Sequence, residues 1–421
     1  MERRRGRIGG LVGSIYATLV FRVATGVVLA RSLGPSGRGE LAAVQAFGVT
    51  ATMILGFGMP IAIGRAAAVD DAPESALMGS AVRYALLTAP LALLCAAGGS
   101  LLLGGSSSAA RTAAFVVIAV APLNVVTDTQ RWIQTARGDL RALGILRAAP
   151  FVALCASIGG LWVLDRLTTA TALATVIVVE LAVNGLGWLL LPVAPARGPE
   201  LRPLLRFAAR SAGSNIAGFG ITKADQAILA PVVDSDDLAF YATAANVAAL
   251  PNGIGQAVSS RTFGDVARSE GRLTTAGAHL RVSTLIAIVL SVALAVGTPF
   301  VIPFLYGEEF RGAITPLRIL LIGVPALVFS TVGRNQLIAL GRPGRASLAD
   351  GLTLLWVGLG LALTVPAFGI VGAAWTSASS YLVRAAVMGR ALRSAGIDDL
   401  LPGPNAGRRL VRRLRRSAGR R

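Results

Sequence analysis

Residues 205–231 read LRFAARSAGSNIAGFGITKADQAILAP, and the rest of the chain is organised on either side of this stretch. It is long enough to span a bilayer, for which about 20 helical residues suffice. At about 100° per residue, one face carries a polar stripe flanked by two charges. These residues are Ser211, Asn215, Gly218, Thr222, Lys223 and Asp225. A charge inside a membrane costs at least about 2.5 kcal/mol, so we expect this face to line a water-filled cavity. The alternative is that Lys223 extends to the membrane surface and pairs with Asp225.

The composition is that of an integral membrane protein. Of the 421 residues, 54% are hydrophobic and only 14% are charged, and the mean hydropathy is +0.67. Soluble domains contain about 25% charged residues. The net charge of +19 does not indicate nucleic-acid binding, because the arginines lie between apolar runs, as the positive-inside rule requires. Cys95, Cys155 and His279 form no disulfide or metal motif, so we expect no metal and no organic cofactor.

The apolar runs predict an all-α membrane protein with about twelve transmembrane helices. The expected spans are 9–30, 41–63, 78–103, 112–134, 144–164, 168–191, 206–231, 238–260, 280–304, 314–338, 348–366 and 370–390. An even number of spans places both ends of the chain on the same side of the membrane.

Arginine placement identifies that side as the cytoplasm. Loops assigned to the outside hold few arginines, which are Arg31, Arg38, Arg111, Arg166 and Arg311. The other loops and the tail hold most of the rest, and the bias alternates loop by loop. We therefore expect both termini to be cytoplasmic. The basic tail at 393–421 either lies on anionic lipid as an amphipathic helix or is solvated.

A weak internal repeat divides the spans into two sets of six. Leu29 and Ala30 correspond to Leu229 and Ala230 at an offset of 200 residues. The predicted domains are an N-lobe at 1–191, a cytoplasmic linker at 192–205 and a C-lobe at 206–392. Because six is even, the lobes would have the same orientation, as a parallel pseudo-repeat around a central cavity.

Charged residues also fall inside spans. Glu180 lies near mid-membrane with Asn184 one turn further, and Arg22 aligns beside Lys223 under the 200-residue offset. The fourth span carries Asn124, Thr127, Asp128 and Arg131 near its inner end. Three arginines near cytoplasmic span ends are expected to snorkel to the membrane surface, namely Arg131, Arg334 and Arg384.

A cavity with fixed cations suits a polyanionic ligand such as a diphosphate. The candidate substrate-binding residues are Arg22, Asn215, Thr222 and Lys223. The candidate ion-coupling residues are Glu180, Asp225 and Asp128, which would bind a proton or a sodium ion, or else neutralise the cations. The sequence contains no P-loop and no nucleophile–base set, so we do not expect an enzyme.

Several segments, in order, resemble polysaccharide-type flippases of the MOP superfamily. They are 28–47 (VLARSLGPSGRGELAAVQAF), 56–63 (GFGMPIAI), Lys223-x-Asp225 followed by YATA at 241–244, 304–310 (FLYGEEF) and 340–343 (LGRP). The resemblance implies an MVF-like fold that moves a polyprenyl-diphosphate-linked oligosaccharide outward across a bacterial cytoplasmic membrane, for cell-surface polysaccharide biosynthesis. Glycan polymerases or glycosyltransferases would be its partners. The family's cationic cavity positions fall on Arg22 and Lys223. Lipid II flippases of the superfamily usually carry two further helices, which does not favour a lipid II substrate here.

Two other functions remain open from the residues alone. A MATE-type multidrug antiporter would have the same lobes, with Asp128, Glu180 and Asp225 binding the coupling cation. The cations Arg22 and Lys223 would disfavour a cationic drug. A membrane glycan polymerase or ligase would need a long outside loop, and the outside loops of this chain are short.

Overall fold

The computed structural model describes residues 2–69, 72–196, 198, 200–209, 225–253, 272–340, 342–397 and 400. Within these ranges the chain forms helices and short connections, and no strand. Asn215, Thr222, Lys223 and the basic tail beyond residue 400 lie outside the described residues. The all-α membrane class predicted from the sequence is confirmed.

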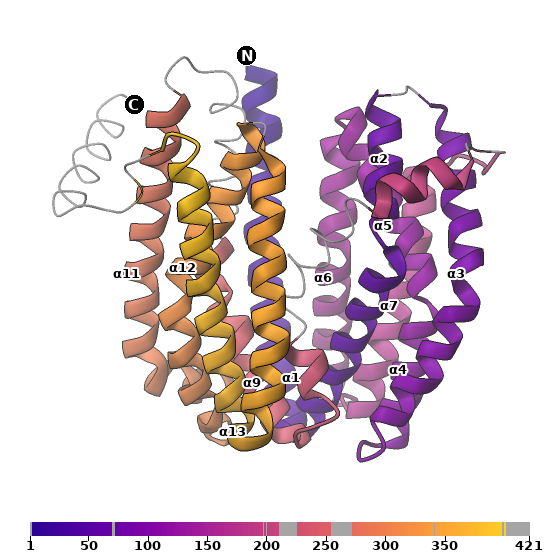
Figure 1. The fold of residues 1–421 in the computed structure, drawn as a ribbon. Coiled ribbons are helices and arrows are strands. Elements are labelled where there is room, and N and C mark those ends of the chain that lie inside the picture. The colour runs from indigo at the N-terminus through magenta and orange to yellow at the C-terminus, as the bar shows by residue number, and fades with distance from the viewer. Residues whose placement is uncertain are drawn as a thin grey trace. The chain divides into compact units, whose positions relative to one another are not determined.

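The described elements are helices, which Figure 1 draws as ribbons. They are α1 (Glu2–Gly56), α2 (Met59–Val69), α3 (Glu74–Leu102), α4 (Ser108–Ala119), α5 (Ala121–Arg137), α6 (Leu140–Val163), α7 (Thr169–Leu190), α9 (Ser235–Ala248), α11 (Arg272–Tyr306), the 3-10 helix η1 (Glu308–Ala313), α12 (Ile314–Ala339) and α13 (Pro343–Arg393). Among the described residues, seven helices are long and apolar enough to cross a membrane, or eight if the bent pair α4–α5 is one span. The number of twelve spans stays a prediction.

Two helices are long enough to cross a bilayer twice, and each is kinked at a glycine. α1 has 55 residues and α13 has 51, which at 1.5 Å per residue is about 80 Å, against a hydrocarbon core of about 30 Å. Gly34 has φ 66° and Gly369 has φ 53°, in the left-handed region that glycine adopts readily. Both kinks fall where the sequence predicts a boundary between spans.

Two predicted spans are interrupted, which corrects the continuous helices expected at 41–63 and 112–134. The first breaks at Phe57 and Gly58, which have φ of 40° and 74°, before α2 begins. The second bends by 48° between α4 and α5. Pro60 and Pro122 lie in the first turns of α2 and α5, where a proline removes no helical hydrogen bond but prevents the preceding helix from continuing.

The described chain forms two compact units. The first comprises residues 1–243 with 303–312, and the second comprises 244–302 with 313–421. The predicted lobes and their linker at 192–205 follow the sequence repeat rather than compactness, and they stay a prediction.

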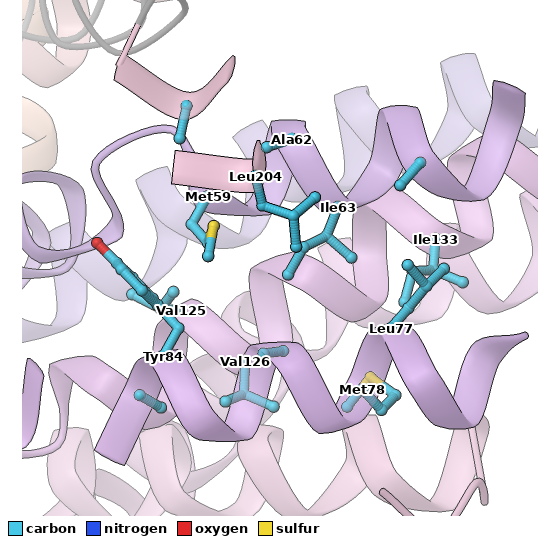
Figure 2. Close-up of a cluster of buried hydrophobic side chains, with 14 of the residues drawn as sticks. Met59, Ala62, Ile63, Leu77, Met78, Tyr84, Val125, Val126, Ile133 and Leu204 are labelled. Carbon is cyan, nitrogen blue, oxygen red and sulfur yellow. The ribbon is translucent and has the colours of Figure 1, made fainter. Parts of the chain in front are cut away.

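The core of the first unit lies between α2, α3, α5 and the helical residues 201–209. Its buried side chains include Met59, Ile63, Leu77, Met78, Val125, Ile133 and Leu204 (Figure 2). The segment that follows α7 packs on α3 so closely that a Cβ at Gly79 would lie 1.7 Å from the Ala196 carbonyl oxygen. This core fixes α5 against α2 and α3 and leaves its opposite side to carry polar groups.

The second unit contains a buried ion cluster that corrects the snorkelling expected of two arginines. Asp350 on α13 is fully buried. Its Oδ1 accepts a hydrogen bond from Arg384 Nη2 at 2.7 Å, and its Oδ2 accepts one from Arg334 Nε at 3.0 Å. The Arg384 side chain is 5% exposed and the Arg334 side chain 31%. Both turn inward because a carboxylate is available inside, which their sequence position did not reveal.

Arg384→Ala should therefore destabilise the protein more than Arg334→Ala. Breaking a buried ion pair costs about 3–5 kcal/mol. Both arginines pair with the buried Asp350, but Arg334 is the more exposed of the two, so solvent screens its pair more strongly and the pair contributes less. The measurement is the melting temperature of the purified protein in detergent. Equal melting temperatures for the Arg384→Ala variant and the wild type would show that the arginine behaves as a surface residue.

Candidate functional site

A cavity of about 420 Å³, lined by apolar residues and by a cluster of polar ones, lies within the first unit, where the two interrupted spans meet. Its walls come from α1, α2, α5, α6 and α7. The lining residues are Val49, Thr52, Met53, Gly56, Gly58, Pro60, Asn124, Val125, Thr127, Asp128, Arg131, Pro150, Glu180, Val183 and Asn184. In membrane transporters, binding sites are typically built beside broken helices, because the helix ends present backbone polar groups to the ligand. The break between α1 and α2 and the first turn of α5 both lie on this cavity.

A hydrogen-bonded network joins α5 to α7 inside the cavity. Asn124 Nδ2 donates to Glu180 Oε1 at 2.7 Å, and Asn184 Nδ2 donates to Asn124 Oδ1 at 2.8 Å. Thr127 Oγ1 donates to Asn184 Oδ1, and Asn124 Nδ2 also donates to Thr52 Oγ1 on α1, at 3.3 Å. These bonds hold the Glu180 carboxyl through one oxygen. The other, Oε2, is buried without a protein partner and is open to a proton or a small cation.

Arg131 is part of the same wall, which corrects the snorkelling expected of it. Its Nη1 contacts Asp128 Oδ1 at 2.7 Å, and its Nη2 donates to the Leu146 carbonyl oxygen at 3.1 Å. Pro150, four residues after Leu146 in α6, has no N–H to donate to that carbonyl. The guanidinium therefore replaces a helical hydrogen bond that the proline removes.

Of the three acids proposed for ion coupling, the structure brings two together. Glu180 and Asp128 both line the cavity, and Arg131 is the only other charged side chain among its lining residues. Asp225 is buried elsewhere in the unit. Its Oδ2 accepts a hydrogen bond from the Tyr241 hydroxyl at 2.5 Å, and its Oδ1 accepts one from the Gln226 N–H at 2.8 Å.

Of the four residues proposed for substrate binding, only Arg22 is described. Its guanidinium carbon lies 5.7 Å from the centre of the Phe151 ring on α6, a cation–π contact between α1 and α6. Asn215, Thr222 and Lys223 lie outside the described residues.

Arg38 is a cation that the sequence reasoning assigned to an outside loop. The residue is 6% exposed, and its Nε and Nη1 atoms are buried without a hydrogen-bond partner. Its charge lies within electrostatic range of Arg22 and of the Tyr306 hydroxyl. The glycines on either side allow this burial: a Cβ at Gly37 would lie 2.6 Å from Thr169 Oγ1, and one at Gly39 would lie 1.8 Å from the Ser235 carbonyl oxygen. In the sequence, the glycines on both sides of Arg38 were the one feature that could have indicated its burial.

Comparison with known proteins gives one family and a set of related folds. The polysaccharide biosynthesis protein family matches residues 8–262, more than half of the chain. No curated protein matches. The lipid II flippase MurJ, in an inward closed conformation, has a TM-score of 0.73 at 12% identity, over 91% of this chain and 87% of that one.

Two further similar structures are transporters of the MOP superfamily. An inward-facing multidrug resistance MATE transporter of the MOP superfamily has a TM-score of 0.65 at 14% identity, over 91% of this chain and 96% of that one. A MOP superfamily transporter from Pyrococcus furiosus, whose binding pocket is described as reversed in polarity, has a TM-score of 0.58 at 15% identity, over 93% and 95%. At sequence identities of 12–15%, these structural similarities show that the proteins share a fold.

Asn124→Leu should destabilise the protein, because it leaves Glu180 Oε1 and one donor of Asn184 unpaired in a buried site. Each unsatisfied buried group costs about 1–3 kcal/mol. The melting temperature in detergent measures the effect. Thr52→Val, which removes only the long contact at the edge of the network, is the matched control and should change the melting temperature less. A larger fall in melting temperature for Thr52→Val than for Asn124→Leu would contradict the hydrogen-bonded network.

Proposed function

Because the chain belongs to the polysaccharide biosynthesis protein family and has the fold of MOP superfamily transporters, we propose that it flips a polyprenyl-diphosphate-linked oligosaccharide from the inner to the outer leaflet. The family match supports a role in making cell-surface polysaccharide. The proposed site is a bacterial cytoplasmic membrane, with both termini in the cytoplasm. Proposed partners are glycosyltransferases or a glycan polymerase, and anionic lipids at the basic tail.

The observation that carries this proposal is the pair of cations on α1. Arg38 has two buried guanidinium atoms with no protein partner, within electrostatic range of Arg22. The planar guanidinium of an arginine in this state favours a multiply charged oxyanion, whose oxygens can accept several charge-assisted hydrogen bonds at once. A diphosphate meets this requirement. Arg22, with Lys223, Asn215 and Thr222 as the predicted contacts of the second lobe, would complete the binding site.

The cavity around Glu180 supports a separate role in coupling. It holds two carboxylates and one arginine, and Glu180 presents an unpartnered oxygen. A proton or a sodium ion bound there would bias alternating access between the two predicted lobes.

A MATE-type cation-coupled multidrug antiporter is the alternative function. The carboxylates Asp128 and Glu180 favour it, since they could bind a cation in this cavity. The cations Arg22 and Arg38 disfavour it, because they would repel a cationic drug.

Arg38→Leu and Arg22→Ala should each abolish flipping without preventing membrane insertion. Removing a charge that is hydrogen-bonded to an ionic ligand costs about 2–5 kcal/mol of binding, and Arg38→Lys should retain part of the activity because it keeps the charge. Flipping is measured in proteoliposomes with a fluorescent polyprenyl-diphosphate oligosaccharide. Arg111→Gln, at an exposed arginine of α4, is the control. Normal flipping by the Arg22→Ala, Arg38→Leu double variant would exclude the cationic site.

Glu180→Gln should uncouple transport from the ion gradient. The amide keeps the shape of the side chain but can no longer gain or lose a proton or bind a cation through charge. Flipping by the wild type should fall when the proton and sodium gradients are collapsed, and flipping by Glu180→Gln should be low in both conditions. Asp225→Asn tests a second of the three candidate acids, which is not among the residues that line the cavity. Equal, gradient-dependent flipping by Glu180→Gln and the wild type would contradict the coupling role.

A further inference from the structure

The interface between α5 and α7 carries polar groups well beyond the cavity. Along α5 the polar positions are Asn124, Thr127, Gln130 and Gln134, which at intervals of three or four residues form one stripe. Along α7 the facing positions are Glu180, Asn184 and Gly187. The contacts pair Asn124 with Glu180, Thr127 with Asn184, and Gln130 with Gly187. The two helices therefore run parallel and in register here.

Two glutamines along this stripe are buried without protein partners: Gln130 lies against Gly187 of α7, and Gln134 lies one turn further along α5, at the level where α7 ends at Leu190. Gln130 is 0% exposed and Gln134 is 3% exposed. The Nε2 and Oε1 atoms of both side chains have no hydrogen-bond partner, and neither residue lines the cavity. Together with Glu180 Oε2, these are five buried polar atoms along one stripe. Buried amides are almost always hydrogen-bonded, to ordered water where no protein group is near.

The room for Gln130 comes from Gly187. A Cβ at this position would lie 2.0 Å from Gln130 Oε1, so any other residue would displace the amide. The other face of α5 is apolar, since Val125, Val126 and Ile133 belong to the hydrophobic core. The glutamines are therefore confined to the side of α5 that faces α7.

The stripe reaches from the carboxyl group to one end of the helix. From Asn124, which holds Glu180, to Gln134 is about 15 Å along the axis, half of a hydrocarbon core of about 30 Å. α5 ends three residues later at Arg137, which pairs with Glu74 at the start of α3. The arginine asymmetry predicts that this end is cytoplasmic.

We infer that a hydrogen-bonded chain of water molecules along the α7-facing side of α5 connects Glu180 with the cytoplasm by way of Gln130 and Gln134. Glu180 then lies between the cavity on one side and a hydrated path on the other, which gives a proton access to the carboxyl without passing through the substrate. The charged groups lining the cavity with Glu180 are Asp128 and Arg131 on α5. The lining residues from α1, α2, α6 and the rest of α7 are uncharged. This inference rests on the coupling role proposed for Glu180.

The test is the access of a small water-borne reagent to single thiols. In a background carrying Cys95→Ala and Cys155→Ala, the variants Gln130→Cys, Gln134→Cys and Thr129→Cys are placed in inside-out vesicles, and Ag⁺ is added to the cytoplasmic face. Thiols left unreacted are counted with a fluorescent maleimide after denaturation. Thr129 is the matched control, because it is fully buried on the same helix and its hydroxyl bonds within the helix, to the Val125 carbonyl. Thiols at positions 130 and 134 should react and the thiol at 129 should not. Equal rates at all three positions would overturn the inference.

A second measurement tests whether the path reaches Glu180. The thiol of Glu180→Cys should react with Ag⁺ from the cytoplasmic face, and adding Gln130→Leu with Gln134→Leu should slow this reaction about tenfold or more, since each lost link removes hydrogen bonds from the chain of water molecules. Thr129→Val should leave the rate unchanged. An unchanged rate in the double leucine variant would refute the path. Neither readout involves glycan, so a failure here is distinct from a failure of the flippase proposal.

Discussion

Inside hydrocarbon, a backbone carbonyl that loses its helical N–H must find another donor, because leaving it unpaired costs several kcal/mol. Arg131 meets this requirement for Leu146, whose normal donor is replaced by Pro150. The Tyr84 hydroxyl does the same for Leu55 at the end of α1, at 2.8 Å. Each bond permits an irregularity in a helix, and each irregularity borders the cavity or its supporting core. The site therefore depends on side chains that donate hydrogen bonds to the unpaired backbone carbonyls around it.

A side chain also pairs with unpaired backbone carbonyls where α11 ends. Arg31, an outside-loop arginine in the sequence prediction, donates from Nε to the Leu305 carbonyl at 2.9 Å and from Nη2 to the Phe304 carbonyl. Cations are stabilising at helix C-termini, where carbonyl groups lack partners. Nearby, Phe310 is fully buried and packs edge-on against Phe240, with ring centroids 5.9 Å apart. These contacts explain why residues 303–312 belong to the first compact unit.

Hydropathy predicted most of the fold because a membrane helix needs only an apolar run of sufficient length. It also placed boundaries between spans at 30–41 and at 366–370, where the structure has helices kinked at Gly34 and Gly369. It missed the interruptions before Met59 and Ala121, because the apolar composition continues through them and only the backbone changes direction. A bend of 48° leaves no trace in average hydropathy.

The site could be predicted only as far as helical periodicity reaches. Spacing placed Glu180 with Asn184 on one face, but which helix faces them depends on packing order. The same limit explains the arginines. Arg384 lies near a span end, and from the sequence alone a turn toward lipid headgroups and a turn toward Asp350 look alike. The deciding carboxylate comes from a segment 34 residues away.

The two buried nitrogens of Arg38 that lack hydrogen-bond partners also have a consequence for how much of the protein a cell retains. A buried cation whose nitrogens lack hydrogen-bond partners lowers the stability of the folded chain when nothing is bound to it. A ligand that binds only the folded chain adds about 2.7 kcal/mol of stability at a hundred times its Kd. Because proteases degrade unfolded membrane proteins, a change of that size in the free energy of unfolding changes the abundance of the protein several-fold. If the proposed anionic substrate binds at Arg38, its supply would therefore control how long the protein survives in the membrane.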